Sequence, residues 1–408
     1  MRRVLLVLVL LVAGCSSPAD VRVEVEPTAL ADAAAHVKVS GLGSGDAVEI
    51  VAETADSAGK VWKAAATYKA DGHGVVDLDR AAPTGGSYAG VDGMGLFWGM
   101  NSPDGDPEQQ YYLPEVSDGL PRSVVRFSVR DEDGKTLATA TQTRRFLNDG
   151  ETNRTLTLAH DKVVGRVFLP KPDGQRHPGV LLLGGSEGGM SLTLTAALLA
   201  AYGFPSLTVA YFGEPGLPKT LKQIPLEYFE TAAKLLAAQP SVDPRRMIAL
   251  GVSRGAEASL LMAQDFPALI HGAVLYAPTS KVAPGFPDYL SKSWTLHGTP
   301  LAEDLIPVDR VSGPVLAVAG TADGVWQSAP AAQLITTELD AAHNRHPHKA
   351  LIYPGAGHNV GTYPYVPQGT QFYESAAQHT AYLGGSRPVN AAAQADAWPQ
   401  VLALLRAL

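Results

Sequence analysis

The pattern of hydrophobic and polar positions changes at about residue 150. Before that point, apolar and polar residues alternate over short segments, which is typical of strands with one buried face. These segments cover residues 36–40, 47–53, 61–68, 75–78, 123–131 and 137–144. Turn-forming runs rich in Gly and Asp separate them, and residues 103–121 have the composition of a long loop. The pattern predicts an antiparallel β-sandwich over residues 27–148.

From about residue 154, short apolar segments alternate with longer helix-like ones. The strand-like runs cover residues 179–183, 206–211, 247–252, 273–276, 315–319 and 349–353, and the helix-like segments cover 192–201, 226–238, 257–264 and 391–408. Short buried strands that alternate with helices are typical of a mostly parallel sheet with helices on both faces. We therefore expect a second domain, of the α/β class, over residues 149–408.

The first 14 residues have the composition of a secretory signal. Arg2 and Arg3 precede an apolar run over residues 4–12, which is too short to span the ~30 Å hydrocarbon core of a membrane. Residues 11–15 resemble the lipobox of bacterial lipoproteins. The resemblance implies cleavage after residue 14, a lipid anchor on Cys15, a tether over residues 15–26, and a location on the extracytoplasmic face of a bacterial cell membrane. The alternative is an ordinary signal peptide in which Cys15 is incidental.

Composition narrows the possible functions. Acidic residues outnumber basic ones, 40 to 32, and the net charge of −8 disfavours nucleic acid as a partner, because nucleic-acid binding requires a basic surface. Cys15 is the only cysteine among 408 residues, so intramolecular disulfides and cysteine-based metal sites are excluded. No motif requires a metal or an organic cofactor, and none is expected.

The strand expected at 247–252 leads into Gly251-Val252-Ser253-Arg254-Gly255, which has the G-x-S-x-G spacing of a nucleophile elbow. In such an elbow a sharp turn between strand and helix exposes the serine hydroxyl, and glycines are needed because neighbouring backbone comes too close for side chains. The pattern alone is weak in a chain with 41 glycines, but its position between a strand and a helix strengthens it. Ser253 is the candidate nucleophile.

A serine nucleophile requires a general base and a carboxylate that orients it, and with this elbow the order along the chain is Ser, Asp or Glu, then His. Asp323 and His358 each follow a predicted strand. Parallel sheets place their functional sites at these carboxyl ends. We therefore interpret Ser253, Asp323 and His358 as nucleophile, orienting carboxylate and general base. The alternatives are that Asp323 only shapes a turn with Gly324 and that His358 is a surface loop residue.

Attack on a carbonyl group creates an oxyanion, which two backbone N–H groups must stabilise. One is expected from Arg254, directly after the nucleophile. The other is expected from the glycine-rich loop 184–189, where the amides of Ser186 and Glu187 are the candidates. The alternative, a phosphate-binding loop, is disfavoured because the loop has neither the G-x-G-x-x-G spacing nor a following Lys-Ser or Lys-Thr.

Several longer motifs resemble the acyl-CoA thioesterase and bile acid-CoA:amino acid N-acyltransferase family, a branch of the α/β-hydrolases. In the C-terminal part they are YFGEPGLPK at 211–219, IPLEYFE at 224–230, GVSRGAE at 251–257 and YPGAGH at 353–358. In the N-terminal part the motif is GGSYAGVDGMGLFW at 85–98. The resemblance covers nearly everything after residue 27, in the family's domain order.

This resemblance implies an Ig-like β-sandwich followed by an α/β-hydrolase domain, and it carries the family's triad onto Ser253, Asp323 and His358. Members that transfer acyl groups to amino acids use a cysteine nucleophile, whereas members with serine generally hydrolyse thioesters. The implied activity is that of a serine hydrolase that cleaves acyl thioesters, or carboxylic esters, through an acyl-enzyme. An extracytoplasmic enzyme would rarely meet coenzyme A, so the leaving group stays open. The alternatives are acyl transfer to an amino acid or other acceptor, and an inert lipoprotein that binds through its N-terminal domain.

Other chemically notable residues have two interpretations each. Lys219, Lys222 and Arg254 could pair with the phosphates of coenzyme A, but solvated surface charges are the simpler interpretation. Trp294, between two predicted strands, could belong to a lid or pack in the core. Glu257, one turn into the elbow helix, either complements the helix dipole or supports the site.

Overall fold

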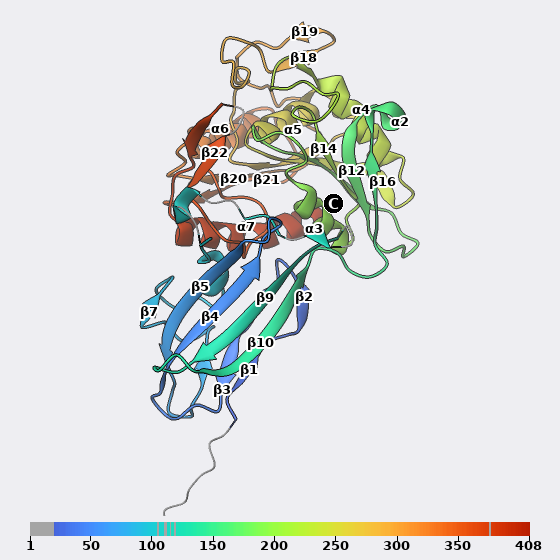
Figure 1. Cartoon of the computed structure of the whole chain (residues 1–408). Coiled ribbons are helices and arrows are strands. Elements are labelled where there is room, and N and C mark those ends of the chain that lie inside the picture. The colour runs from blue at the N-terminus through green and yellow to red at the C-terminus, as the bar shows by residue number, and fades with distance from the viewer. Residues whose placement is uncertain (1–19, 104–105, 110–111, 115, 118–119, 375–376) are drawn as a thin grey trace, which may run out of the picture.

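The computed structural model describes residues 20–408 apart from residues 104–105, 110–111, 115, 118–119 and 375–376. The described chain forms two domains, and the β-rich N-terminal one lies at the bottom of Figure 1. The signal predicted at 1–14 and Cys15 lie outside the described residues. The predicted tether is partly inside them, and there the prediction differs from the structure, because Arg22–Glu24 form strand β1 and pair with β3 (Lys38–Ser40).

Two sheets build the N-terminal domain. The smaller has the order β1-β3-β6, where β6 is Val76–Asp77. The larger has the order β2-β10-β9-β4-β5-β7, with β8 against β9. Its strands are β2 (Thr28–Leu30), β4 (Ala47–Ala55), β5 (Val61–Lys69), β7 (Gly85–Gly86), β8 (Val116–Ser117), β9 (Leu120–Arg130) and β10 (Thr136–Arg145). The ladders are antiparallel except that of β2 with β10.

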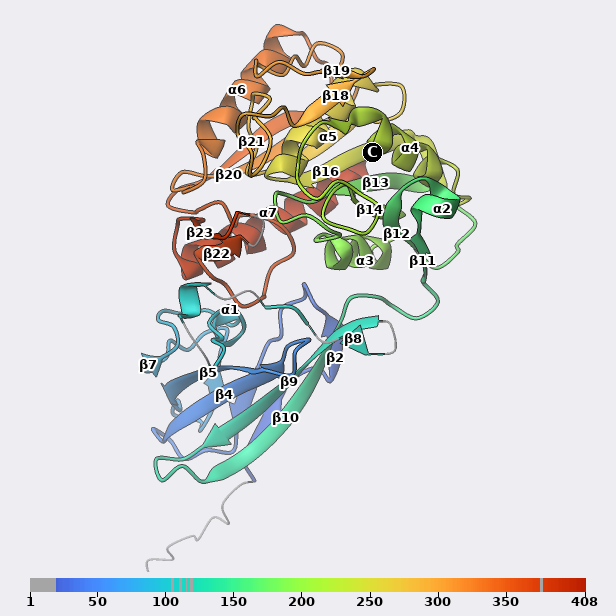
Figure 2. The same ribbon diagram turned by 45° about the horizontal axis from the view of Figure 1, so that its top comes forward.

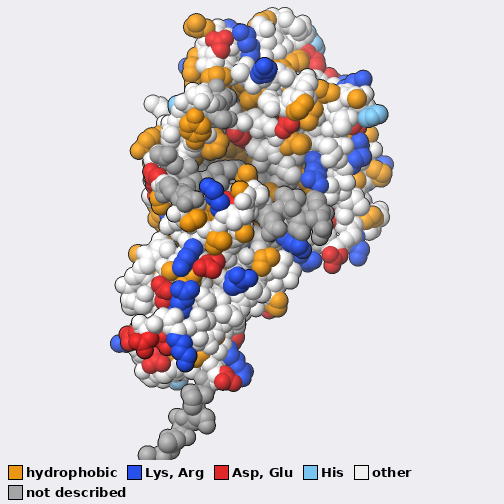
Figure 3. All heavy atoms as spheres, viewed as in Figure 1, with side chains coloured by type: hydrophobic (Ala, Val, Ile, Leu, Met, Phe, Trp, Pro, Cys, Tyr) orange, Lys and Arg blue, Asp and Glu red, His pale blue; other side chains and the backbone are white. Residues whose placement is uncertain are grey.

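Alternating burial along these strands gives the two sheets a common core. Val39 from the smaller sheet and Ile50 and Phe127 from the larger one are fully buried in it. Two short helical segments, α1 (Gly95–Trp98) and η1 (Pro107–Gln109), lie between β7 and β8. On the face seen in Figure 3, acidic and basic side chains are mixed over this domain, so this face carries no charge of a single sign.

An eight-stranded sheet forms the centre of the C-terminal domain, in the order β11-β12-β14-β13-β16-β17-β20-β21. Its strands are β11 (Thr152–Leu156), β12 (Val164–Leu169), β13 (His177–Leu183), β14 (Ser206–Ala210), β16 (Val242–Val252), β17 (Gly272–Tyr276), β20 (Val315–Gly320) and β21 (His348–Tyr353). The six strands from β14 to β21 are parallel and coincide with the six predicted apolar runs. The antiparallel strands β11 and β12 were not predicted.

Helices cover both faces of this sheet, as the alternation of segments predicted. Leu181 and Leu183 of β13 pack on the side of α4 (Leu226–Ala237), α5 (Arg254–Asp265) and α6 (Ser328–Ala341). Val180 and Leu182 pack on the side of α3 (Thr193–Ala201) and α7 (Arg387–Ala407), which is turned toward the N-terminal domain (Figures 1 and 2). The remaining elements are α2 (Leu158–Asp161), the small sheet of β15 (Ile224–Pro225), β18 (Trp294–Leu296) and β19 (Thr299–Pro300), and the hairpin of β22 (Gln371–Glu374) and β23 (His379–Tyr382). Within the described part of the chain, no helix combines the length and the hydropathy that a membrane crossing requires.

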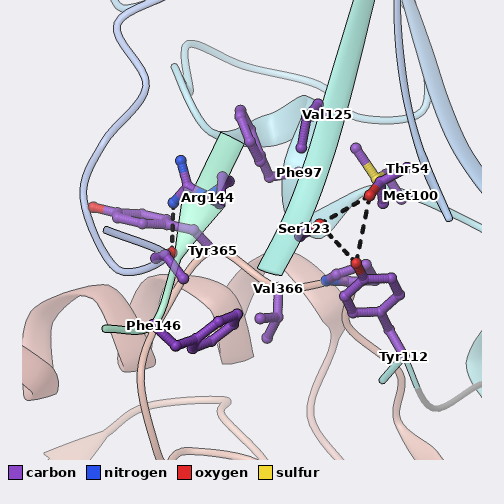
Figure 4. Close-up of a pocket in the computed structure, with 12 residues that line it drawn as sticks. Thr54, Phe97, Met100, Tyr112, Ser123, Val125, Arg144, Phe146, Tyr365 and Val366 are labelled. Carbon is purple, nitrogen blue, oxygen red and sulfur yellow. Dashed lines mark hydrogen bonds between the residues drawn. The ribbon is translucent and has the colours of Figure 1, made fainter. Parts of the chain in front are cut away.

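The junction of the two domains contains a buried arginine and a small cavity (Figure 4). Burial lowers the pKa of Arg144 to about 10. The hydroxyl groups of Thr54, Tyr112 and Ser123, which line the same cavity, bond to one another, with 2.7 Å between Tyr112 and Ser123. The cavity of about 20 Å³ has room for one water molecule, and residues of both domains line it. The two domains are therefore packed against each other at this junction.

Candidate active site

Ser253 stands at the turn between β16 and α5, where the G-x-S-x-G pattern predicted it. Its φ of 55° lies in the left-handed region, which a serine rarely adopts. The two glycines make this turn possible. A β-carbon on Gly251 would lie 2.0 Å from the Gly255 carbonyl oxygen, and one on Gly255 would lie 1.9 Å from the Leu183 carbonyl oxygen. The turn that carries Ser253 therefore requires glycine at both positions.

Asp323 and His358 form a buried hydrogen-bonded pair. The Nδ1 atom of His358 lies 2.9 Å from Oδ2 of Asp323, and the two side chains are 9% and 2% exposed. Burial alone would raise the pKa of Asp323, but the hydrogen bond and charge of His358 outweigh it, and the pKa is lowered. The other oxygen, Oδ1, accepts the Val325 amide at 2.8 Å. Asp323 thus shapes a turn as well as holding His358, and the interpretation of His358 as a surface residue is wrong.

Contacts through the sheet edge link Ser253 to this pair. The Ser253 amide donates to the carbonyl of Tyr276, at the end of β17. The next carbonyl, that of Ala277, accepts the indole N–H of Trp326 at 3.0 Å, and the Trp326 ring lies edge-on against His358 with centroids 5.5 Å apart. The three predicted residues are therefore brought to one end of the sheet. Trp326 was missed by the sequence analysis, although it lies only three residues after Asp323.

The glycine-rich loop after β13 lies beside Ser253, as predicted. A β-carbon on Gly185 would stand 3.3 Å from Cβ of Ser253 and 2.6 Å from Oε2 of Glu187. Ser186 and Glu187 therefore directly follow the residue that flanks Ser253. The Glu187 carboxylate folds back and accepts the Gly185 amide at 2.9 Å. The hydroxyl of buried Tyr211 donates to the carbonyl of Gly184 at 2.6 Å and fixes the start of the loop.

Arg254 and Glu257 form a buried ion pair one turn into α5. Their side chains are 6% and 0% exposed, and Arg254 Nη1 lies 3.0 Å from Glu257 Oε2. Burial raises the pKa of Glu257 to about 7, although the charge of Arg254 and two hydrogen bonds oppose the shift. Arg254 is therefore not a solvated surface charge. Its buried guanidinium is also not in a position to meet a coenzyme A phosphate.

The ion pair fastens the segment between β17 and β20 to the elbow helix. The Arg254 guanidinium donates to the Ala283 and Pro284 carbonyls at 3.1 and 2.9 Å and to Ser293. The Glu257 carboxylate accepts the indole N–H of Trp294 at 2.7 Å. Trp294 is fully buried, so it packs in the core rather than forming a mobile lid.

The remaining cations of the sequence analysis are on the surface. Lys219 is exposed, and Lys222 forms an exposed ion pair with Asp288 at 3.2 Å. The described residues include no cluster of three or more His, Cys, Asp or Glu side chains that could hold a metal ion.

Two family models match the chain. Residues 32–157 match the acyl-CoA thioester hydrolase/BAAT N-terminal region, and residues 224–297 and 284–407 match the BAAT/acyl-CoA thioester hydrolase C-terminal region. The resemblance noted in the sequence is thereby confirmed.

Curated relatives match over nearly the whole chain. Mouse peroxisomal succinyl-coenzyme A thioesterase is 30% identical over 93% of this chain and 94% of its own length. Mouse acyl-coenzyme A thioesterase 6 is 31% identical over 90% and 91%. Among solved structures, a dienelactone hydrolase-like phosphotriesterase from metagenomic libraries is 17% identical and covers 64% of this chain and 99% of its own, with a TM-score of 0.45. The chain belongs to the acyl-CoA thioester hydrolase/BAAT family.

Proposed function

We propose that this protein is a serine hydrolase that cleaves acyl thioesters, or carboxylic esters, through an acyl-enzyme on Ser253. The observation that carries the proposal is the buried Asp323–His358 pair at the same sheet edge as Ser253 on its strained elbow. Membership of a family named for thioester hydrolysis supports the substrate class. The N-terminal domain is proposed to be the family's Ig-like sandwich.

In this mechanism the Ser253 hydroxyl attacks the acyl carbonyl while His358 takes its proton. Asp323 keeps the imidazole oriented and stabilises the imidazolium that forms. Collapse of the tetrahedral intermediate expels the thiolate or alkoxide, which receives the proton from His358. Water then attacks the acyl-Ser253 ester, with His358 again acting as base, and a carboxylic acid leaves.

Two backbone amides are proposed to stabilise the oxyanion. The Arg254 amide is the first of α5, and the first amides of a helix have no partner within it. The second donor belongs to the loop beside Ser253, where the Ser186 and Glu187 amides remain the candidates. The Gly185 amide is not a candidate, because it already donates to the Glu187 carboxylate.

We also propose that the mature protein is lipid-anchored at Cys15 on the extracytoplasmic face of a bacterial membrane. The support is the lipobox-like sequence at residues 11–15. Cys15→Ser should release the protein from the membrane fraction, and unchanged retention would count against the anchor. At that location the leaving group need not be coenzyme A.

A substrate panel tests the proposed activity. Acyl-CoA, acyl-pantetheine and simple esters with the same acyl chain are compared, with Ser253→Ala as the control. We expect turnover of at least one series, with loss of nearly all of it in Ser253→Ala. Product analysis with glycine or taurine present separates hydrolysis from acyl transfer. Equal turnover by the Ser253→Ala variant would sink the proposal.

A further inference from the structure

One backbone carbonyl, that of Leu383, holds the loops of both Asp323 and His358. It accepts the His358 amide at 2.6 Å and the Gly324 amide at 3.1 Å. Gly324 directly follows Asp323. Any shift of Leu383 therefore moves both members of the pair, or breaks a hydrogen bond to one of them.

Leu383 is connected to the N-terminal domain through a single residue. Its amide donates to the Thr370 carbonyl at 2.8 Å, at the base of the β22–β23 hairpin. The Thr370 amide donates to the Glu108 carbonyl at 3.2 Å, and the Thr370 hydroxyl donates to the Glu108 carboxylate at 2.6 Å. Glu108 lies in η1 of the N-terminal domain. One path from that domain to the amide of His358 thus runs from Glu108 through Thr370 and Leu383.

A second set of hydrogen bonds connects the N-terminal domain to the His358 loop, through the start of α7. The half-buried Arg387 guanidinium donates to the carbonyls of Trp98 and Met100, in and just after α1, at 3.2 and 2.8 Å. Burial lowers the pKa of Arg387, and three backbone carbonyls accept hydrogen bonds from its Nε and Nη2 atoms. One turn later, buried Asn390 accepts the Gly357 amide at 2.8 Å. The residue before His358 is therefore also tied to an element clamped onto the N-terminal domain.

We propose that the N-terminal domain is a positioning element for the Asp323–His358 pair, acting through Glu108, Thr370 and Leu383. The inference rests on the proposed function, because it assigns the pair a catalytic role. Both residues stand on loops, which are the mobile parts of a fold unless other elements hold them. A displacement of about 1 Å at a catalytic group can reduce turnover by roughly a hundredfold, so hydrogen bonds that fix these loops affect rate more than binding.

The test removes the Thr370 hydroxyl bond and compares it with another hydrogen bond of the junction. Thr370→Val keeps the shape of the side chain and the backbone hydrogen bonds but loses the hydroxyl bond to Glu108. Glu108→Ala removes the carboxylate that accepts the same bond. Thr370→Ser restores a hydroxyl. The matched control is Trp398→Phe, which removes the 2.6 Å bond from the Trp398 indole to Asp32, also between α7 and the N-terminal region.

We expect kcat on an activated acyl ester to fall about five- to tenfold in Thr370→Val and Glu108→Ala, with KM within about twofold. Thr370→Ser should recover most of the loss, and Trp398→Phe should leave kcat unchanged even where it lowers the melting temperature. The downfield NMR resonance of the proton between His358 and Asp323 should shift or broaden in Thr370→Val and Glu108→Ala, and stay at its wild-type position in Thr370→Ser and Trp398→Phe. The proposal is overturned if kcat is unchanged in both Thr370→Val and Glu108→Ala. It is also overturned if Trp398→Phe loses kcat to the same extent as they do.

Failure of this positioning proposal can be distinguished from failure of the proposed function. If wild-type protein shows no Ser253-dependent turnover, the proposed function fails. The proton resonance then still reports whether the Glu108–Thr370 bond positions the pair, and an unchanged resonance in Thr370→Val contradicts that.

Discussion

Ser253 and the Asp323–His358 pair lie at the same edge of one sheet, but different parts of the molecule hold them. Ser253 is held by the packing of β16 and α5 against the sheet, where a side chain at Gly251 or Gly255 would collide with neighbouring backbone. Asp323 and His358 stand on loops, and the Leu383 carbonyl, which accepts the amides of Gly324 and His358, lies outside the sheet.

The difference shows which parts of the site depend on other parts of the chain. A residue with a strained backbone persists only where its surroundings over-determine its conformation, and short-range steric contacts do so at Ser253. The alignment of the Asp–His pair instead depends on hydrogen bonds that reach the N-terminal domain. Four substitutions test how the site is held, and they are given in order of decreasing effect.

Asp323→Asn should lower kcat by roughly 10³- to 10⁴-fold, because an amide no longer stabilises the imidazolium and favours the wrong tautomer of His358. The fold should survive, since the asparagine oxygen can still accept the Val325 amide. Steady-state kinetics and the melting temperature check both expectations. A kcat within tenfold of wild type would remove Asp323 from the triad.

Gly255→Ala should destabilise the protein by more than about 3 kcal/mol, because its β-carbon would stand 1.9 Å from the Leu183 carbonyl oxygen. Gly72→Ala is the matched control, since no atom lies within 4 Å of the added carbon, and its effect should stay within about 0.5 kcal/mol. Urea unfolding of both variants measures the difference. Similar stabilities would mean that the elbow tolerates side chains and that sterics do not hold Ser253.

Glu257 should make stability depend on pH. Its pKa is about 7 in the folded protein and 4.5 when unperturbed, so between these values the folded state binds more protons than the unfolded one. The stabilisation is complete below pH 4.5 and is lost as pH rises through 7, by up to about 3 kcal/mol. Unfolding at pH 5 and pH 8 should show this loss in wild type and not in Glu257→Gln. An identical pH dependence in both proteins would contradict it.

Glu187→Gln should have the smallest effect, on substrate choice. The carboxylate flanks Gly185 on the side of Ser253 and should repel an acyl group that ends in a second carboxylate. We expect kcat/KM for a succinyl ester, relative to a butyryl ester, to rise about three- to tenfold, and less at high salt. Glu187→Asp retains the charge and serves as the control. A ratio unchanged by Glu187→Gln would show that the carboxylate does not act on the substrate.

Local patterns in the sequence predicted the central sheet and the candidate site. The apolar runs and the residues directly after them located Ser253, Asp323 and His358, because a parallel sheet gathers its strand ends. Strand β11 (Thr152–Leu156) was missed because most of its residues are exposed, so its sequence lacks the alternation of apolar and polar residues that predicts a strand. The burial of Arg254 was missed because its partners, at Ala283, Pro284 and Ser293, lie about thirty to forty residues away along the chain. The Glu108–Thr370 contact joins residues 262 positions apart, which no short-range pattern reports.

The central claim is that Ser253 is the nucleophile, and covalent labelling tests it most directly. The folded protein is treated with a fluorophosphonate probe, and the adduct is located by peptide mass spectrometry. We predict one adduct, on Ser253, that forms much more slowly in Asp323→Asn. Absence of a Ser253 adduct in well-folded protein would contradict the account.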